Sequence, residues 1–328
     1  MGRRLAGLAP GAASAVPLLG VPPLGVPPLG VSPLGVPLLG VSLLALALSL
    51  GCGDAAVAHP ADCMGLAHED AMACAEERFW EAHTERYEAR EATYDLLGAV
   101  IEQVPEGVDD VALGRLHFRR AALGMELMLE HGIDRTANVV PDLEAAIRLD
   151  PAEAKYPPWL DSMDLVLGFA FGDEARFDAA VERIDANVAR YPVGNVLSIT
   201  GTMSGFPLET GLPQKAVRML EGWECTEGWC MRNTERAPYS QPGLEVHFAD
   251  AYARVGDTAQ ARAHLEAALV AEDAESWPYR DWVEETLADL DGYVARYTEL
   301  GEEGSAVPLV YANSDFGCTL CHGAVPPR

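Results

Sequence analysis

Between about Ala71 and Leu300 the sequence has the pattern of helices joined by Gly and Pro turns. Val, Ile and Thr do not alternate with polar residues over any long stretch, as they would in half-buried strands. Hydrophobic residues make up 49% of the 328-residue chain and charged residues 22%, which supplies a core and is too apolar for a wholly disordered chain. We therefore expect an all-α fold.

One stretch, Leu244–Asp273, has the pattern of a helical hairpin. Its small residues let two antiparallel helices approach closely, its larger residues fill the groove between them, and Gly256 with Asp257 makes the turn. The positions that define this pattern are Ala249, Tyr252, Gly256, Ala261, Leu265 and Ala268. A second stretch, Trp159–Pro192, repeats it with Leu167, Gly168, Phe171, Ala180 and Ile184.

Two further stretches, Pro141–Pro151 and Pro213–Trp223, show mainly the second helix of such a unit. The matching alanines at 180, 216 and 261 are 36 and 45 residues apart, so insertions lie between units whose usual period is about 34 residues. On these residues the chain resembles the tetratricopeptide-repeat family over about 110–275. The resemblance implies a curved solenoid of helical hairpins with irregular insertions, whose concave face binds a protein or peptide segment, and it implies no catalysis. The alternative is a generic helical bundle.

Helices are also expected at both ends of the repeats. The first, about Ala71–Gln103, carries an aromatic stripe at helical spacing. The stripe consists of Trp80, His83, Tyr87 and Tyr94. It is explained either as packing that caps the repeats or as an aromatic wall near a cofactor. Another helix, about Asp281–Leu300, is expected to close the other end.

The balance of acidic and basic residues limits the kinds of partner that the protein is expected to bind. With 50 acidic and 23 basic residues the formal net charge is −27. Such a field disfavours binding to nucleic acid or to anionic lipid, both of which need Lys and Arg. We therefore expect no nucleic-acid partner.

The N-terminal segment has the layout of an export signal. Arg3 and Arg4 precede an apolar run, Val41–Leu50, and no acidic residue occurs before Asp54. The run is shorter than the ~20 residues that a spanning helix needs. Leu48–Cys52 also resembles a bacterial lipobox, which implies lipidation of Cys52 and export to the periplasm or cell envelope with a lipid anchor. The alternative is ordinary cleavage nearby. Proline-rich pentapeptide repeats before the run are interpreted as low-complexity sequence in a discarded leader.

The expected organisation has four segments. Residues 1–51 form the leader, and residues 52–109 a disulfide-bearing segment with a capping helix. Residues 110–300 form the helical repeats, and residues 301–328 a linker and an extended C-terminal tail.

Six cysteines besides Cys52 fall into three close pairs, which fits an oxidising compartment. Cys63 with Cys74 and Cys225 with Cys230 are expected to form local disulfides. Metal binding at these pairs is the weaker alternative, because Cys225–Cys230 has no neighbouring His to complete a zinc site.

The third pair belongs to the strongest chemical motif in the chain. Cys318-x-x-Cys321-His322 has the spacing of a c-type haem attachment site. In that chemistry two thiols add to the haem vinyl groups and the adjacent His reaches the iron as an axial ligand. Cys318 and Cys321 are thus candidates for covalent haem attachment and His322 for iron ligation. A Cys318–Cys321 disulfide and a metal clasp between chains are the alternatives.

The second axial ligand is not determined by the sequence. Several methionines and five histidines are available, the histidines being His68, His83, His117, His131 and His247. His83 is the weak first candidate, because aromatic residues surround it on its helix. The iron could also be five-coordinate.

Three functions are compatible with these features. The first is an envelope adaptor that binds a protein segment and carries one covalent c-type haem within a larger redox assembly. The second is a mono-haem electron-transfer cytochrome with a redox partner, and the third is a haem-free scaffold with a terminal disulfide. A classical enzyme is the least supported class, since the chain has no phosphate loop and no His-Glu-x-x-His motif.

Overall fold

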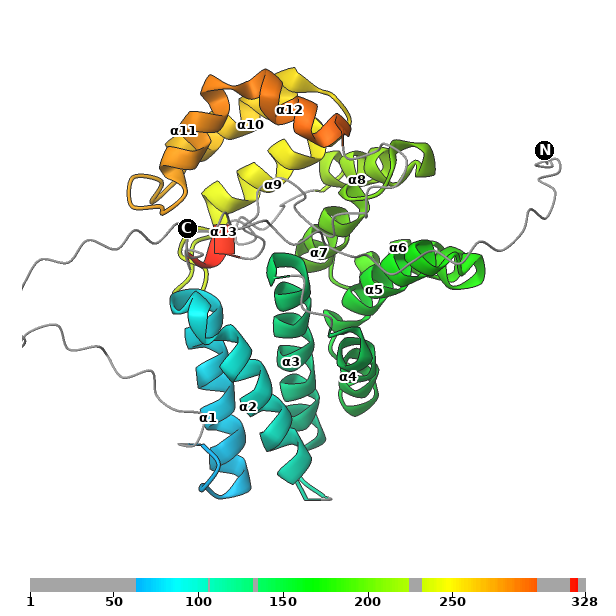
Figure 1. The fold of residues 1–328 in the computed structure, drawn as a ribbon, viewed down its shortest axis with the longest axis vertical. Coiled ribbons are helices and arrows are strands. Elements are labelled where there is room, and N and C mark those ends of the chain that lie inside the picture. Colours follow the sequence, from blue (N-terminus) through cyan, green and yellow to red (C-terminus); the bar gives the residue numbers. More distant parts are fainter. Residues whose placement is uncertain (1–62, 106, 132–134, 224–231, 300–318, 324–328) are drawn as a thin grey trace, which may run out of the picture. The chain divides into compact units, whose positions relative to one another are not determined.

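The computed structural model describes residues 63–105, 107–131, 135–223, 232–299 and 319–323, all of which fall in one compact unit. Thirteen α-helices make up most of these residues (Figure 1). The described part of the chain contains no strand, only an isolated bridge between Thr234 and Ala237. The expectation of an all-α fold is confirmed.

The helices follow one another with short connections. Their bounds are α1 His68–Trp80, α2 Arg90–Gln103, α3 Asp110–His131, α4 Thr136–Leu149, α5 Tyr156–Phe171, α6 Glu174–Arg190, α7 Pro192–Ser204, α8 Leu212–Glu221, α9 Ser240–Arg254, α10 Thr258–Val270, α11 Arg280–Ala288, α12 Leu290–Glu299 and α13 Thr319–His322. Four consecutive pairs pack closely against each other: α3 with α4, α5 with α6, α7 with α8, and α9 with α10.

Two of these pairs turn by the same local chemistry. Gly172 ends α5 and Gly256 follows α9, with φ of 66° and 80°, a left-handed conformation that glycine adopts without strain. The next residue is an Asp in both cases. Asp173 accepts a hydrogen bond from the N–H of Arg176 at 3.1 Å, and Asp257 accepts one from Gln260 at 3.0 Å. A glycine stop followed by an N-capping aspartate therefore produces each hairpin.

Small residues lie where the paired helices approach most closely. Ala180, Ala216 and Ala261, the three aligned alanines of the repeat pattern, are each 0% exposed. A Cβ at Gly168 would lie 2.7 Å from the backbone N of Phe177, so α5 and α6 meet almost backbone to backbone there. The spacing of small residues thus encodes helix pairing.

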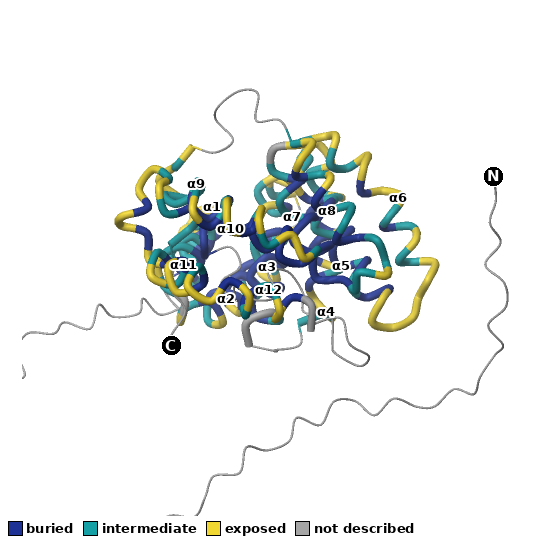
Figure 2. The backbone as a smooth tube through the Cα atoms, turned by 90° about the horizontal axis from the view of Figure 1, so that it is seen from above, coloured by how far each residue is buried: buried dark blue, intermediate teal, exposed yellow. Residues whose placement is uncertain are grey.

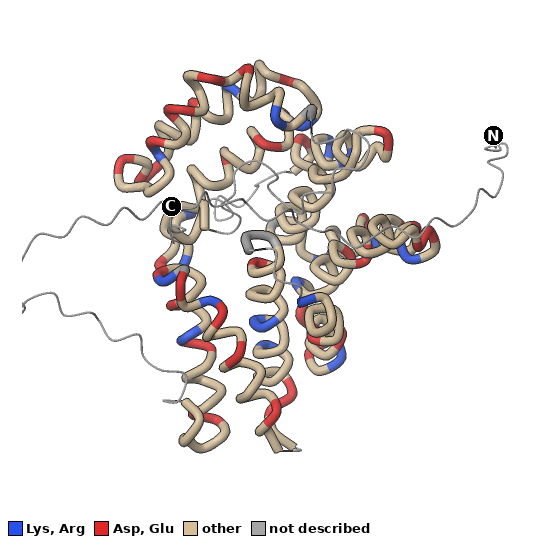
Figure 3. Tube along the Cα trace, viewed as in Figure 1, with Lys and Arg blue, Asp and Glu red and all other residues tan. Residues whose placement is uncertain are grey.

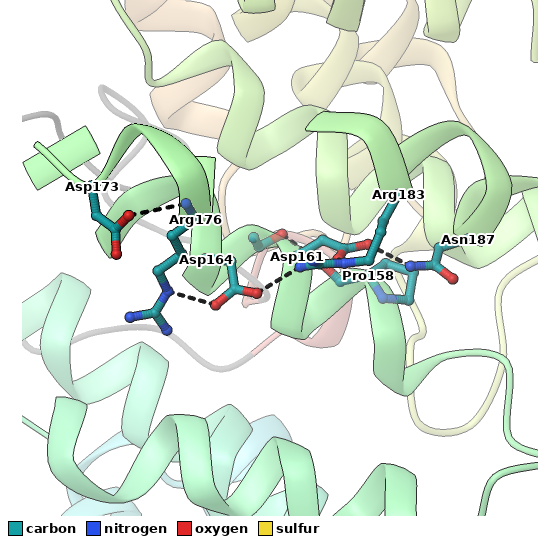
Figure 4. A network of polar contacts seen from close by, with 8 residues as sticks. Pro158, Asp161, Asp164, Asp173, Arg176, Arg183 and Asn187 are labelled. Carbon is teal, nitrogen blue, oxygen red and sulfur yellow. Dashed lines mark hydrogen bonds and ion pairs between the residues drawn. The ribbon is translucent and has the colours of Figure 1, made fainter. Parts of the chain in front are cut away.

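A polar network also joins α5 to α6 (Figure 4). Arg183 donates to Asp161 at 2.7 Å and to Asp164 at 2.6 Å. Asn187 donates to the second oxygen of Asp161 at 2.6 Å, and Arg176 donates to Asp164 at 2.8 Å. Burial raises the pKa of Asp161 against the effect of these donors. The network satisfies a carboxylate that would otherwise be costly to bury.

The core follows the inner faces of the helices, as the burial-coloured trace in Figure 2 shows. One cation lies deep within it. Arg254, 1% exposed, donates to the carbonyl of Phe206 at 2.7 Å and to the carbonyl of Tyr297. It therefore ties the ends of α7 and α12 to α9.

The expected single helix over Ala71–Gln103 is wrong. A π-helical turn, Glu81–Glu85, and a 3-10 turn, Tyr87–Ala89, separate α1 from α2, and the two helices pack against each other. The N–H of Arg86 donates to the carbonyl of Glu81 at 2.7 Å, which is the i to i+5 bond of a π turn. No Gly or Pro marks this break in the sequence.

The expected single helix over Asp281–Leu300 is also wrong, because it is two helices, α11 and α12, divided at Asp289. The Asp289 carboxylate accepts a hydrogen bond from the N–H of Gly292 at 3.3 Å. An aspartate in this position starts a new helix instead of continuing the old one.

Acidic and basic residues intermingle along the described helices instead of gathering into one basic face (Figure 3). Among the residues that the structure describes, no helix has both the length and the apolar character needed to cross a bilayer.

Candidate functional site

The last described element, α13, holds part of the C-terminal motif. It packs against α9 and against the π-helical turn Glu81–Glu85 (Figure 1). The expectation of an extended tail is wrong for Thr319–His322, which form this short helix. Contacts with the rest of the fold stabilise it, because an isolated turn of helix is unstable in water.

Two aromatic side chains anchor α13. The indole N–H of Trp277 donates to the carbonyl of Leu320 at 2.8 Å, and the hydroxyl of Tyr279 lies 2.7 Å from Thr319 Oγ1. Thr319 and Leu320 are 0% and 1% exposed. The start of α13 is thus part of the core.

Cys321 packs directly on the backbone of α9. A Cβ added at Gly243 would lie 2.7 Å from Cys321 Sγ, and the N–H of Tyr239 donates to the Cys321 carbonyl at 3.0 Å. The Cys321 thiol is free, and burial raises its pKa to about 12. Glycine at 243 is therefore what allows the motif to dock.

The chain leaves α13 by a glycine turn. Gly323 has φ of 84° and its N–H donates to the carbonyl of Thr319 at 2.7 Å. A Cβ there would lie 2.9 Å from Cε2 of Tyr239. The residue after His322 must therefore be glycine for reasons of both conformation and space.

His322 points toward the turn that follows α1. Its ring centroid lies 4.4 Å from that of His83 and 6.1 Å from that of Trp80. Its Nδ1 is hydrogen-bonded to the carbonyl of Arg236. Burial, followed by the charge of His83, lowers the pKa of His322 to about 3, so the ring is neutral at pH 7.

His83 lies in the π turn and is 5% exposed. Its Nδ1 is 2.6 Å from Glu126 Oε1, close but not aligned as a hydrogen bond. Its ring stacks on Phe79 at 5.1 Å between centroids. The π turn thus places an imidazole between an aromatic ring and a buried carboxylate.

Glu126 of α3 is the buried anion behind His83. Arg90 approaches its other oxygen at 3.1 Å and also donates to the carbonyls of Ala82 and His83, both at 3.4 Å. Burial alone would raise the pKa of Glu126, but the charges of His83 and Arg90 outweigh it and lower the pKa to about 2. The carboxylate is therefore ionised and holds both partners.

Trp80 is the remaining aromatic neighbour of His322. The guanidinium carbons of Arg119 and Arg236 lie 4.5 Å and 4.4 Å from the centroid of its ring. Burial lowers the pKa of Arg119, whose Nη2 donates to Glu76 at 3.5 Å. Among the described residues neither the Nε of Arg119 nor the buried Nε1 of Trp80 has a hydrogen-bond partner. Buried polar atoms without partners are unusual, and an ordered water or a bound group would satisfy them.

The other predicted site residues have separate positions. Cys63 and Cys74 form a disulfide with Cα atoms 5.7 Å apart, which confirms that pair. The remaining cysteine predictions, for Cys52, Cys225, Cys230 and Cys318, lie outside the described residues.

Of the histidines considered as a second ligand, only His83 is recorded beside His322 in the described chain. His68 is exposed on α1, and the side chain of His131 is not described. His117 Nδ1 is 2.7 Å from Asp142, and His247 Nε2 is 3.0 Å from the Thr200 hydroxyl.

Sequence reasoning missed four residues of this site: Arg90, Arg119, Glu126 and Arg236. One had a usable signal. Glu126 is the single acid in the apolar run Ala121–Leu129, and a lone acid on the buried side of a helix predicts a buried cation or imidazole partner. Arg236 lies in an irregular segment before α9 and carries no such signal.

The side chains present fit the haem that the motif implies. Cys321 and His322 are consecutive on a docked helix, and the His83 imidazole lies beside His322. The guanidinium groups of Arg119 and Arg236 lie over the ring of Trp80, which is itself 6.1 Å from the His322 ring. No group of three or more His, Cys, Asp or Glu residues in the described ranges could hold a bare metal ion. A haem needs only axial ligands from the protein, since its macrocycle supplies the other donors. The imidazole rings are in contact, so a ligated iron would have to part them.

The fold and the site together define a class: an all-α protein of helical hairpins with a Cys-His pair docked beside a buried histidine. Comparison of the chain with family models, with curated proteins and with solved structures finds no match. The function therefore rests on the residues themselves.

Proposed function

We propose that this protein is an exported adaptor of tetratricopeptide-like helical hairpins that carries one covalently attached c-type haem. Cys318 and Cys321 would hold the haem through thioether bonds, and His322 would be an axial ligand of its iron. The observation that carries the proposal is the docked position of the half-buried His322, beside Trp80 and His83. The bound haem would supply a one-electron redox centre.

The protein's own groups support this assignment in three ways. The Nδ1 of His322 is engaged by a backbone carbonyl, which fixes the ring and leaves Nε2 for a metal. The arginines 119 and 236 provide positive charge for the carboxylates that haem carries. The aromatic rings of Phe79 and Trp80 offer an apolar wall.

The adaptor role rests on the hairpins. Four helix pairs with buried small residues at their contacts are what a repeat scaffold requires, and a scaffold of this kind binds an extended partner segment along one face. The export signal and the lipid at Cys52 would place the scaffold at an envelope membrane, where c-type haem is attached.

A second candidate, an electron-transfer cytochrome, is favoured by one observation. Three hydrogen bonds from Trp277, Tyr279 and Tyr239 fix α13 to the body, which would hold a haem rigidly for electron exchange. A reversible potential coupled to a small soluble donor would favour this function. Loss of a partner on substitution of the hairpin surface, with the haem retained, would favour the adaptor.

The test of the haem is direct. The full chain is produced in a periplasm that has haem-attachment machinery, and the pyridine haemochrome is measured after acid–acetone extraction. A c-type band is expected that disappears in the Cys318→Ala/Cys321→Ala variant and persists in Cys225→Ala/Cys230→Ala, the matched control. A colourless wild-type protein would overturn the proposal, and a colourless protein without free thiols would leave a haem-free scaffold with a terminal disulfide.

A further inference from the structure

We propose that His83 is the second axial ligand, so that the iron is held between two imidazoles, His83 and His322. This inference rests on the proposed haem and adds the ligand that the C-terminal motif does not contain. The two residues are 239 positions apart in the sequence (322 − 83), yet their ring centroids lie 4.4 Å apart.

Both rings have at Nδ1 a group of the kind found beside metal-ligating histidines, which is a hydrogen-bonded carbonyl at His322 and a close carboxylate at His83. Such a histidine commonly presents its other ring nitrogen to a carboxylate or a backbone carbonyl, which fixes the tautomer and orientation. Glu126 is 2.6 Å from Nδ1 of His83, and the Arg236 carbonyl accepts from Nδ1 of His322. Neither Nε2 makes a hydrogen bond or ion pair within the described part of the chain, so both remain for the iron.

The local backbone is built around His83. The π turn Glu81–Glu85 interrupts what would otherwise be one helix, and insertions of this kind concentrate at functional sites. The hydroxyl of Thr84 donates to the carbonyl of Trp80 at 2.6 Å, and Arg90 donates to the carbonyls of Ala82 and His83. These bonds satisfy carbonyls that the interruption of the helix would leave without a hydrogen bond. The turn therefore holds the His83 imidazole in place.

Among the described histidines, His83 is the one whose ring contacts that of His322. Asp142 contacts His117, and the Thr200 hydroxyl contacts His247 inside the core. His83 faces Glu126 through Nδ1 and stacks on Phe79, and a structural role explains these two contacts but not the additional contact with the His322 ring. The pair is therefore best explained as a two-imidazole site.

The spin state of the haem iron tests whether His83 is its second axial ligand. In the oxidised wild-type protein, optical and electron paramagnetic resonance spectra are expected to show low-spin iron, and the reduced protein should bind carbon monoxide slowly. His83→Ala should convert the iron to high spin and speed carbon monoxide binding at least tenfold, with the covalent haem retained. Added imidazole should restore the low-spin spectrum, which a loss of structure would not allow.

The matched control is His117→Ala, which removes a partly buried histidine bonded to an aspartate and should leave the spin state unchanged. His83→Met, a second ligand of different type, should keep low-spin iron and raise its potential. A low-spin spectrum that survives His83→Ala, or a high-spin wild type, would overturn the inference and leave the haem intact. A wild type without covalent haem would overturn the proposed function itself, so the two failures are distinguishable.

Discussion

Gly243 of α9 lies against Cys321 of α13 so closely that a methyl group at Gly243 would fall 2.7 Å from the cysteine sulfur. It would also lie 2.8 Å from the carbonyl carbon of Leu320. Neither neighbour is the free end of a long side chain. The docking of the C-terminal motif therefore depends on the absence of a side chain at one position of α9.

Gly243→Ala is expected to release α13 while leaving α9 intact, since alanine favours the helix by about 1 kcal/mol over glycine. Amide hydrogen exchange of Thr319–His322 should accelerate at least tenfold. Gly98→Ala is the control, because a Cβ there meets two side-chain atoms of Arg120 and no backbone atom of a neighbouring element. Unchanged protection of α13 in the Gly243 variant would show that the helix docks by other means.

Glu126→Gln is expected to destabilise the fold by about 3 kcal/mol. The substitution removes the negative charge that lies 3.1 Å from the guanidinium of Arg90, a cation that is 1% exposed. Urea unfolding monitored by circular dichroism measures the change.

The matched control for this prediction is Glu91→Gln. Glu91 pairs with Arg135 at 3.3 Å on the surface, and its side chain is 59% exposed, so its loss should cost less than about 1 kcal/mol. Equal effects of the two substitutions would contradict the interpretation of Glu126 as a buried counter-ion.

Local sequence chemistry predicted much of the fold. The Gly-Asp pairs at 172–173 and 256–257 each contain a glycine that ends one helix and an aspartate that caps the next. Both helical hairpins were therefore predictable. The aligned alanines were predictable for the same reason, because helix contact needs small side chains at regular spacing.

The break between α1 and α2 could not be predicted from the same signals. A stretch without Gly or Pro favours a continuous helix. The π turn is accompanied by side-chain bonds from Arg90, seven and eight residues away, and by a contact with the distant Glu126. The proximity of His83 to His322 likewise depends on where α13 docks, which no local pattern encodes. The Cys-His spacing indicated a site at the C-terminus, but only the tertiary structure indicates that His83 lies beside it.

Removal of the Cys63–Cys74 disulfide is expected to lower the free energy of unfolding by about 3 kcal/mol. The bond joins cysteines that are 11 positions apart in the sequence and so restricts the unfolded chain. Cys63 is 1% exposed and lies in the core that α1, α2 and α3 share. The unfolding midpoint of Cys63→Ala/Cys74→Ala should match that of the wild type under reducing conditions. A variant as stable as the oxidised protein would indicate that the bond adds nothing to the fold.

Stability should also depend on pH through His247. Burial lowers its pKa to about 4 from an ordinary value of 6.5, and its Nε2 lies 3.0 Å from the hydroxyl of Thr200. Between pH 6.5 and 4 the unfolded chain binds a proton that the folded chain excludes. The neutral ring therefore makes its full contribution to the free energy of unfolding above pH 6.5, and this contribution is lost as the pH falls toward 4. The loss is on the order of 3 kcal/mol.

Because many carboxylates titrate in the same range, the measurement is a comparison of two proteins. The free energy of unfolding is determined at pH 7 and at pH 4.5 for the wild type and for His247→Gln, whose amide can still reach Thr200. The variant should lose about 2 to 3 kcal/mol less than the wild type over this interval. Parallel pH profiles would mean that His247 is protonated in the folded state, which a ring buried beside a hydroxyl in the core does not favour.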